Sequence, residues 1–243
     1  MLGPSRTAKD GLLPPMLVAL TVVTGLVDSF SYLQLGHVIV ANMTGNLVFL
    51  ALALAGASGF SVLRSLVALG AFGLGALAAG RLCRVDSRLA DRREVLLGFT
   101  AGVQMVLLAT AVIMAALTTA PVTAGFRYSI IVLLAAAMGA QNATARTLAV
   151  PDLSTTLLTM GITGLAADSR LAGGSGAQAP RRLIPVAAML VGAVIGTLLI
   201  RHVAVVYPLV IAVVILGVVA ATGYLLAHPA PDLRPERALV VGG

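Results

Sequence analysis

Apolar runs of about 20 residues recur along this chain, separated by short loops that carry arginine. An α-helix of that length spans the ~30 Å hydrocarbon core of a bilayer, whereas a transmembrane β-strand shows about 10 residues of alternating polarity. Of the 243 residues, 59% are hydrophobic and 10% are charged, against roughly 25% charged in soluble domains. The sequence therefore predicts an all-α, polytopic membrane protein, with residues 1–243 as a single transmembrane domain.

The apolar segments follow one another in a repeated order. We expect them at 12–34, 38–56, 60–80, 95–118, 126–148, 153–167, 183–201 and 205–227. The order long, short, long, long occurs twice, which predicts two repeated halves over 12–118 and 126–227. The Pro-rich remainder at 228–243 is expected to be a disordered tail.

Charge placement selects between two topologies. The net charge of +7 comes from arginines spread over loops, which indicates membrane orientation and argues against a nucleic-acid partner. If all eight segments cross, the arginine-bearing loops 81–94 and 168–182 lie on opposite sides. If 38–56 and 153–167 are short re-entrant segments, both loops and both termini are cytoplasmic and six crossings remain. We favour six crossings, which make the halves an inverted 3+3 repeat, although 38–56 is long enough to span.

Asp28 is the one acidic residue inside a predicted span. A carboxylate there costs several kcal/mol unless it is paired or solvated, so it marks either a functional site or a structural ion pair, for example with Arg127. A polar block, Asn42-Met43-Thr44-Gly45-Asn46, follows shortly. Its side chains can cap the next helix, and the same helix terminus can bind an anion or a polar solute.

A matching polar group lies about 114 positions later, at 139–161. It contains Gln141, Asn142, Thr144, Ser154, Thr155, Thr156 and Thr159. The alternative for its hydroxyls is hydrogen bonding to their own helix backbone. The candidate substrate-binding residues are Asp28, Ser31, Asn42, Thr44, Gly45, Asn46, Gln141, Asn142, Thr155, Thr156 and Thr159.

Small residues are spaced for close helix packing at Ala71, Gly75, Ala76, Gly80, Gly192 and Gly196. The three histidines are far apart in sequence, and we expect no metal site, no cofactor and no catalytic residues. An intramembrane enzyme is the least favoured alternative, because Asp28 alone does not supply an acid and a base.

Four stretches resemble a family of uncharacterised bacterial membrane proteins, the YoaK or DUF1275 family: GLVDSFSYLQLG, VIVANMTGNLVFLALAL, AMGAQNATARTL and VPDLSTTLLTMGITGLAADS. The resemblance covers nearly the whole chain and implies a multi-span protein of the bacterial inner membrane. It implies no substrate.

These observations predict a transporter or channel for a small solute or ion, with a polar site where the two interrupted segments approach the middle of the membrane. The alternative is a membrane scaffold or assembly partner whose small-residue faces form oligomer contacts. The expected partners are the lipid bilayer and an unknown small solute or ion, with a homo-oligomer left open.

Overall fold

The computed structural model describes residues 11–85, 92–117, 124–148, 158–174 and 179–228. The helices are α1 (Leu13–Gln34), α2 (Met43–Leu54), α3 (Val62–Val85), α5 (Arg93–Ala116), α6 (Ala124–Leu148), α7 (Leu158–Ala167), the 3-10 helix η3 (Arg170–Ala172), α8 (Ala179–His202) and α9 (Tyr207–Ala227). Six of them, α1, α3, α5, α6, α8 and α9, are long and apolar enough to cross a membrane. Because the described part of the chain contains helices and no strand, the predicted polytopic α-helical fold is confirmed.

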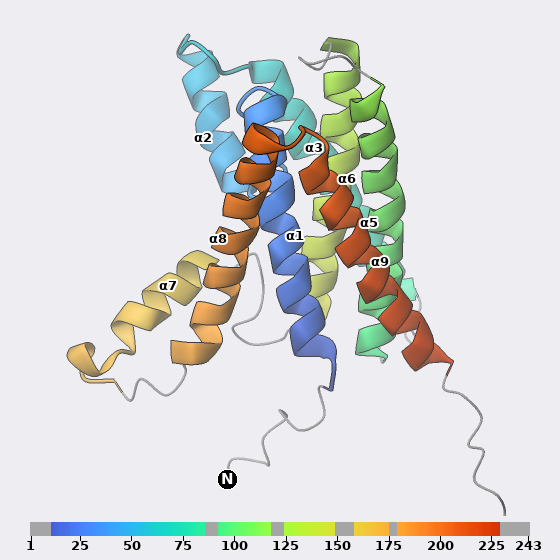
Figure 1. Cartoon of the computed structure of the whole chain (residues 1–243). Coiled ribbons are helices and arrows are strands. Elements are labelled where there is room, and N and C mark those ends of the chain that lie inside the picture. Colours follow the sequence, from blue (N-terminus) through green and yellow to red (C-terminus); the bar gives the residue numbers. More distant parts are fainter. Residues whose placement is uncertain (1–10, 86–91, 118–123, 149–157, 175–178, 229–243) are drawn as a thin grey trace, which may run out of the picture.

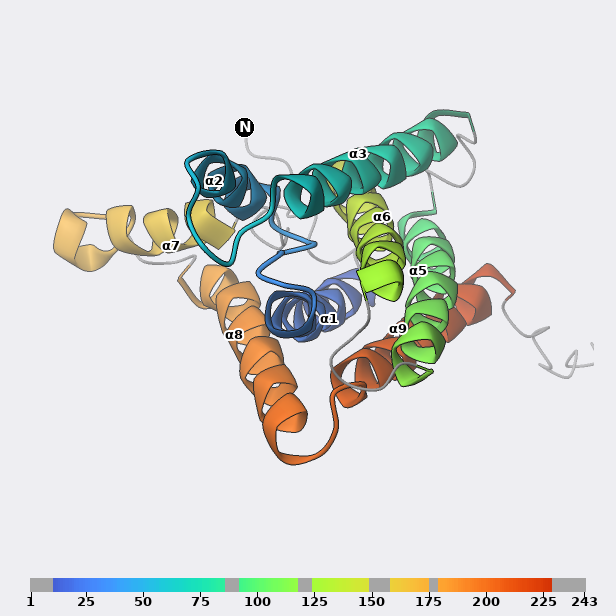
Figure 2. The ribbon, with the colours of Figure 1, turned by 90° about the horizontal axis from the view of Figure 1, so that it is seen from above.

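Helix α1 lies at the centre of the bundle. Viewed from above, α2, α3, α6, α5, α9 and α8 surround it, and α7 lies at the periphery against α8 (Figure 2). In its most apolar 18-residue window, α1 has 72% of its residues buried, against 17% for α3 and 22% for α8. Asp28 is therefore shielded from lipid because it belongs to the innermost helix.

The bundle packs through close crossings at glycine residues. A Cβ placed on Gly75 of α3 would lie 2.0 Å from the carbonyl oxygen of Ala136 in α6. A Cβ on Gly192 of α8 would lie 2.3 Å from the carbonyl oxygen of Val22 in α1. Only glycine permits these backbones to approach so closely. The small-residue faces at Gly75 and Gly192 are thus occupied by helices of the same chain. Gly80 is different, because a Cβ there would meet nothing within 4 Å.

The structure moves two predicted segment boundaries, the end of α3 and the start of α2. Helix α3 continues to Val85, through part of the expected loop 81–94, and buries Cys83. The long side chains of Arg81 and Arg84 allow this extension, because they can reach water from the end of an apolar helix. The second segment was predicted as 38–56, but helix α2 begins only at Met43 and has 12 residues.

Residues 35–42, here called the returning segment, lead from α1 back into the bundle. Figure 1 shows α2 running from the middle of the bundle to the same end at which α1 finishes and α3 begins. At 12 residues, α2 is about 18 Å long and too short for a ~30 Å core. This geometry agrees with the six-crossing model for the first half. Residues 153–157 of the second short segment lie outside the described residues.

An aromatic cluster holds the returning segment at that end. The His37 ring lies 5.0 Å from Tyr32 and 5.7 Å from Phe60, centroid to centroid, and Phe60 stacks on Phe49 at 5.2 Å. The His37 ring also hydrogen-bonds the carbonyl oxygen of Gly59 over 3.2 Å. The turn before α3 is therefore tied to the turn after α1.

Candidate functional site

The returning segment is anchored on Asp28 of α1. The backbone N–H of Ala41 donates to Oδ1 of Asp28 over 2.9 Å, and the side-chain amide of Asn42 donates to Oδ2 over 2.8 Å. Asp28 lies six residues before the end of α1 at Gln34, which is about 9 Å along the axis. The first turn of α2 therefore starts at that depth inside the bundle.

The side chain of Asn46, in α2, forms hydrogen bonds with the backbone of the returning segment. Its Oδ1 accepts a hydrogen bond of 3.1 Å from the N–H of Ile39, and its Nδ2 donates to the carbonyl oxygen of Ile39. A neighbouring β-strand would supply the same pair of bonds. Non-helical backbone at membrane depth is tolerated only where such groups are satisfied or meet water, and the fully buried Asn46 meets this requirement.

These contacts decide two questions that the sequence left open. Asn42 occupies the N-cap position of α2 but makes no capping hydrogen bond, so the capping interpretation is wrong. Its side chain is engaged by Asp28 instead. Among the described residues, the partners of the Asp28 carboxylate are neutral donors of the returning segment: the backbone N–H groups of Val40 and Ala41 and the side-chain amide of Asn42. Hydrogen bonds therefore take the place of the ion pair with Arg127, which was one of the two alternatives for Asp28.

The other candidates of the first half lie around this anchor. The Ser31 hydroxyl is buried and donates to the backbone carbonyl of Asp28 over 3.1 Å. Gly45 is half-buried, and a Cβ on it would come within 3.3 Å of the Ile39 side chain. Thr44 is exposed on the outer face of α2. Of the predicted block, Asn42 and Asn46 are thus the residues that face the protein interior.

The candidates of the second half do not converge on Asp28. Asn142 is half-buried and donates to the carbonyl oxygen of Met138, one turn earlier in α6, over 2.9 Å. Thr159 is exposed on α7. Thr155 and Thr156 lie outside the described residues. Gln141 alone points into the core, where its Nε2 donates to Oγ1 of Thr24 in α1 over 3.0 Å.

A second polar group, called here the buried polar layer, lies between α1, α5 and α6. Its members are Thr24, Gln104 and Gln141, all at most 3% exposed. The register of α5 and α6 is fixed one turn away, where the hydroxyls of Thr100 and Thr144 lie 3.0 Å apart. Since the two helices run in opposite directions (Figure 1), one turn from Thr100 leads to Gln104 and one turn from Thr144 leads to Gln141, at the same height.

The buried polar layer has unused hydrogen-bonding capacity. Within the described residues, neither Nε2 nor Oε1 of Gln104 has a partner, and Oε1 of Gln141 has none. A buried amide without a partner costs roughly 2 to 7 kcal/mol, depending on the reference state. Sequence reasoning missed Thr24, Thr100 and Gln104. Gln104 was visible, because it is the one amide side chain in the predicted span 95–118.

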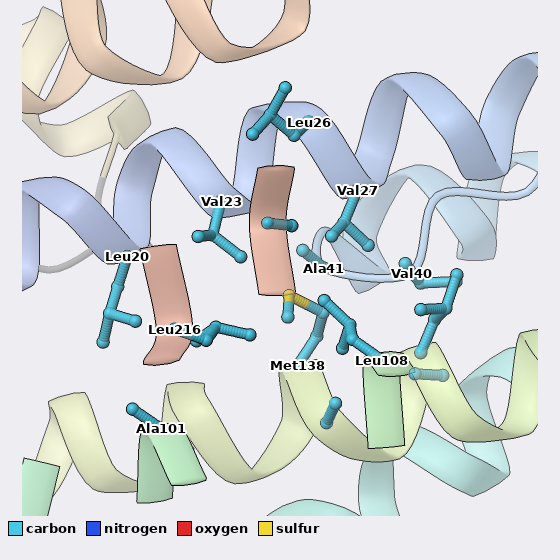
Figure 3. Packing of buried hydrophobic residues seen from close by; sticks show 14 of the residues in the cluster. Leu20, Val23, Leu26, Val27, Val40, Ala41, Ala101, Leu108, Met138 and Leu216 are labelled. Carbon is cyan, nitrogen blue, oxygen red and sulfur yellow. The ribbon is translucent and has the colours of Figure 1, made fainter. Parts of the chain in front are cut away.

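An apolar layer lies next to the polar one, on the side of the returning segment. Figure 3 shows Val40 and Ala41, at the inner tip of that segment, among Val27, Leu108 and Met138. Val27, Leu108 and Met138 lie about one helical turn from Thr24, Gln104 and Gln141, respectively, toward the end of the bundle at which α1 finishes. The tip therefore completes an apolar plug over buried polar groups. No cluster of metal-ligating side chains occurs in the described ranges.

The helices and the interior polar groups define a polytopic α-helical membrane protein with an interrupted segment. The family model described as "Protein of unknown function (DUF1275)" matches residues 16–222. The chain belongs to this family, and the resemblance seen in its motifs is confirmed.

One curated relative is the UPF0700 transmembrane protein YoaK of Bacillus subtilis (strain 168), which is 32% identical over 155 residues. The match covers 63% of this chain and 65% of that protein. No solved structure matches the chain.

Proposed function

We propose that this protein is a transporter or channel for a small solute or ion, with its polar site where the returning segment reaches the interior of the bundle. The observation that carries the proposal is the plug. The tip residues Val40 and Ala41 lie between α1 of the first half and Met138 of the second. Extended backbone at this depth typically lines a pathway in transport proteins.

The inverted repeat is part of the proposal. Consider a two-fold relation that exchanges α1 with α6 and α3 with α8. It maps the packed pair α1–α8 onto the pair α6–α3, and both pairs are observed. The close glycine crossings are related by the same two-fold exchange. Gly25 of α1 meets the Met189 carbonyl of α8, and Gly139 of α6, 114 positions after Gly25, meets the Phe72 carbonyl of α3.

The proposed orientation places the N- and C-termini in the cytoplasm of a bacterial cell, in the inner membrane. Helices α3, α6 and α9 end, and α1, α5 and α8 begin, at one end of the bundle (Figure 1). Arg81, Arg84, Arg93, Arg146 and Arg182 lie in terminal turns at that end. The opposite end carries Arg64, Arg127 and Arg201. The larger number of arginines at the first end supports its assignment to the cytoplasmic side.

Solute and ion flux into proteoliposomes tests the proposal. Wild-type protein is expected to pass at least one member of a panel of anions, cations and neutral solutes faster than lipid alone. Asn42→Ala and Asp28→Asn, which loosen the tip, should change that rate, whereas Val48→Ala on the exposed face of α2 should not. Monodispersity in detergent controls for folding. A wild-type protein inert across the whole panel would overturn the proposal.

A further inference from the structure

We infer that Gln104 and Gln141 bind a small uncharged molecule that both donates and accepts hydrogen bonds, of the size of water, urea or glycerol. The inference rests on the proposed function and names its substrate class. Gln104 is fully buried in the middle of α5, and both polar atoms of its side chain lack partners among the described residues. These unused groups are what a bound polar molecule would satisfy.

The available groups have a mixed character. Nε2 of Gln104 offers hydrogen-bond donors, and Oε1 of Gln104 and Oε1 of Gln141 offer acceptors. The amide of Gln141 is held in place, because its Nε2 donates to Thr24 and its orientation follows from that bond. Because Gln104 and Gln141 lie at the same height on adjacent helices, their donors and acceptors together match a solute with both functions. An anion would use only the donors.

Charge favours a neutral ligand. On α1, α5 and α6, the cationic and acidic side chains Arg93, Glu94, Arg127 and Arg146 belong to terminal turns. Asp28 is the exception, and both of its carboxylate oxygens already accept hydrogen bonds from the returning segment. A bare ion in the polar layer would therefore lose its hydration without a free counter-charge, which is costly in a bundle interior.

The plug gives this site a sidedness. Val40 and Ala41 pack in the apolar layer (Figure 3), on the side of the polar layer that faces the end of the bundle at which α2 finishes. On the other side of the layer, the hydroxyls of Thr100 and Thr144 continue the polar path by one turn. A neutral solute reaches Gln104 and Gln141 past the threonine pair when that buried contact opens, and leaves past the tip of the returning segment when that tip moves.

Stopped-flow light scattering of proteoliposomes, under gradients of urea, glycerol or sucrose, measures the neutral fluxes, and ion-sensitive dyes measure Na⁺, K⁺ and Cl⁻. The wild type should raise urea, glycerol or water permeability several-fold over lipid alone and pass no ion. Gln104→Leu, which keeps the volume but removes both polar atoms, should abolish the increase. Val103→Leu changes the neighbouring exposed position and should retain it. Gln104→Met replaces Gln104→Leu if the latter is not monodisperse.

The outcomes separate the inference from the proposed function. Ion flux without neutral flux would overturn the substrate class and leave a channel or transporter. Neutral flux that persists in Gln104→Leu would overturn the site and again leave the proposed function. Absence of every flux, in protein that remains monodisperse, would overturn both.

Discussion

The side-chain amide of Asn42 donates a 2.8 Å hydrogen bond to Oδ2 of Asp28, across 14 positions of sequence. The only acid of the predicted spans is thus paired with the first amide of the polar block. This bond, together with that from the Ala41 N–H to Oδ1, fixes the depth at which α2 begins. The pair joins the innermost helix to the one segment that interrupts the helical pattern.

Exchanging the side chains of Asp28 and Asn42 should lower the free energy of unfolding less than either single substitution. Asn42→Asp brings two carboxylates together and should lower the free energy of unfolding by about 1–3 kcal/mol. Asp28→Asn turns an amide donor toward the Asn42 amide and should do the same. In the double variant, Asn at 28 accepts from Ala41 and donates to Asp at 42, so most of the loss should be recovered. Thermal unfolding in detergent gives the comparison, and additive losses would contradict the pairing.

Loss of Asn46 should free the backbone of Ile39. Asn46→Ala leaves the part-buried N–H and carbonyl of Ile39 without partners, at up to about 1–3 kcal/mol for each group. The expected result is faster hydrogen exchange at Ile39 together with a lower unfolding temperature. Thr197→Ala is the control, because the half-buried Thr197 hydroxyl donates to the carbonyl oxygen of Ala193 in its own helix. Unchanged exchange at Ile39 in Asn46→Ala would refute this role.

Alanine substitutions at the glycines of α3 should differ sharply in their effect on the free energy of unfolding. Gly75→Ala places a methyl group against the Ala136 carbonyl and forces α3 and α6 apart, which should cost about 1–3 kcal/mol. Around Gly73 a Cβ meets nothing within 4 Å, so Gly73→Ala should be neutral or slightly stabilising through helix propensity. Gly192→Ala should resemble Gly75→Ala. Equal effects at 73 and 75, measured by thermal unfolding, would contradict the crossing.

Cysteine labelling should place Ser58 and Val203 on one side of the membrane and Leu171 on the other. All three are exposed, and the turns that carry Ser58 and Val203 lie at the same end of the bundle (Figure 1). Single cysteines are introduced in a Cys83→Ser background and tested with a membrane-impermeant maleimide. Labelling of Ser58→Cys from the same side as Leu171→Cys would mean that α2 crosses fully.

The sequence predicted the helical membrane fold because long apolar runs are specified locally. It also indicated the break near Asn42, since arginine placement disfavoured a full crossing at 38–56. It could not show how the break is stabilised. The bonds from Ala41 to Asp28 and from Ile39 to Asn46 depend on where an extended backbone folds back in space, and no helical periodicity encodes that path.

The candidate site was predicted unevenly for the same reason. Asp28, Asn42, Asn46 and Gln141 are buried or half-buried within the bundle, whereas Thr44 and Thr159 are exposed. Membership of the core depends on which face of a helix turns inward, and the apolar runs are hydrophobic on every face. Gln104 was overlooked because it stands alone in its span, and its significance comes from its neighbours on α1 and α6.

The central position of α1 also constrains biosynthesis. Its close neighbour through Gly25 and Gly192 is α8, and it also packs against α9, so its principal partners are helices that emerge from the ribosome long after α1 itself. While these are still being made, the face of α1 that carries Gly25 has no permanent neighbour. Burial of the innermost helix of this bundle therefore has to wait until α8 and α9 have been made.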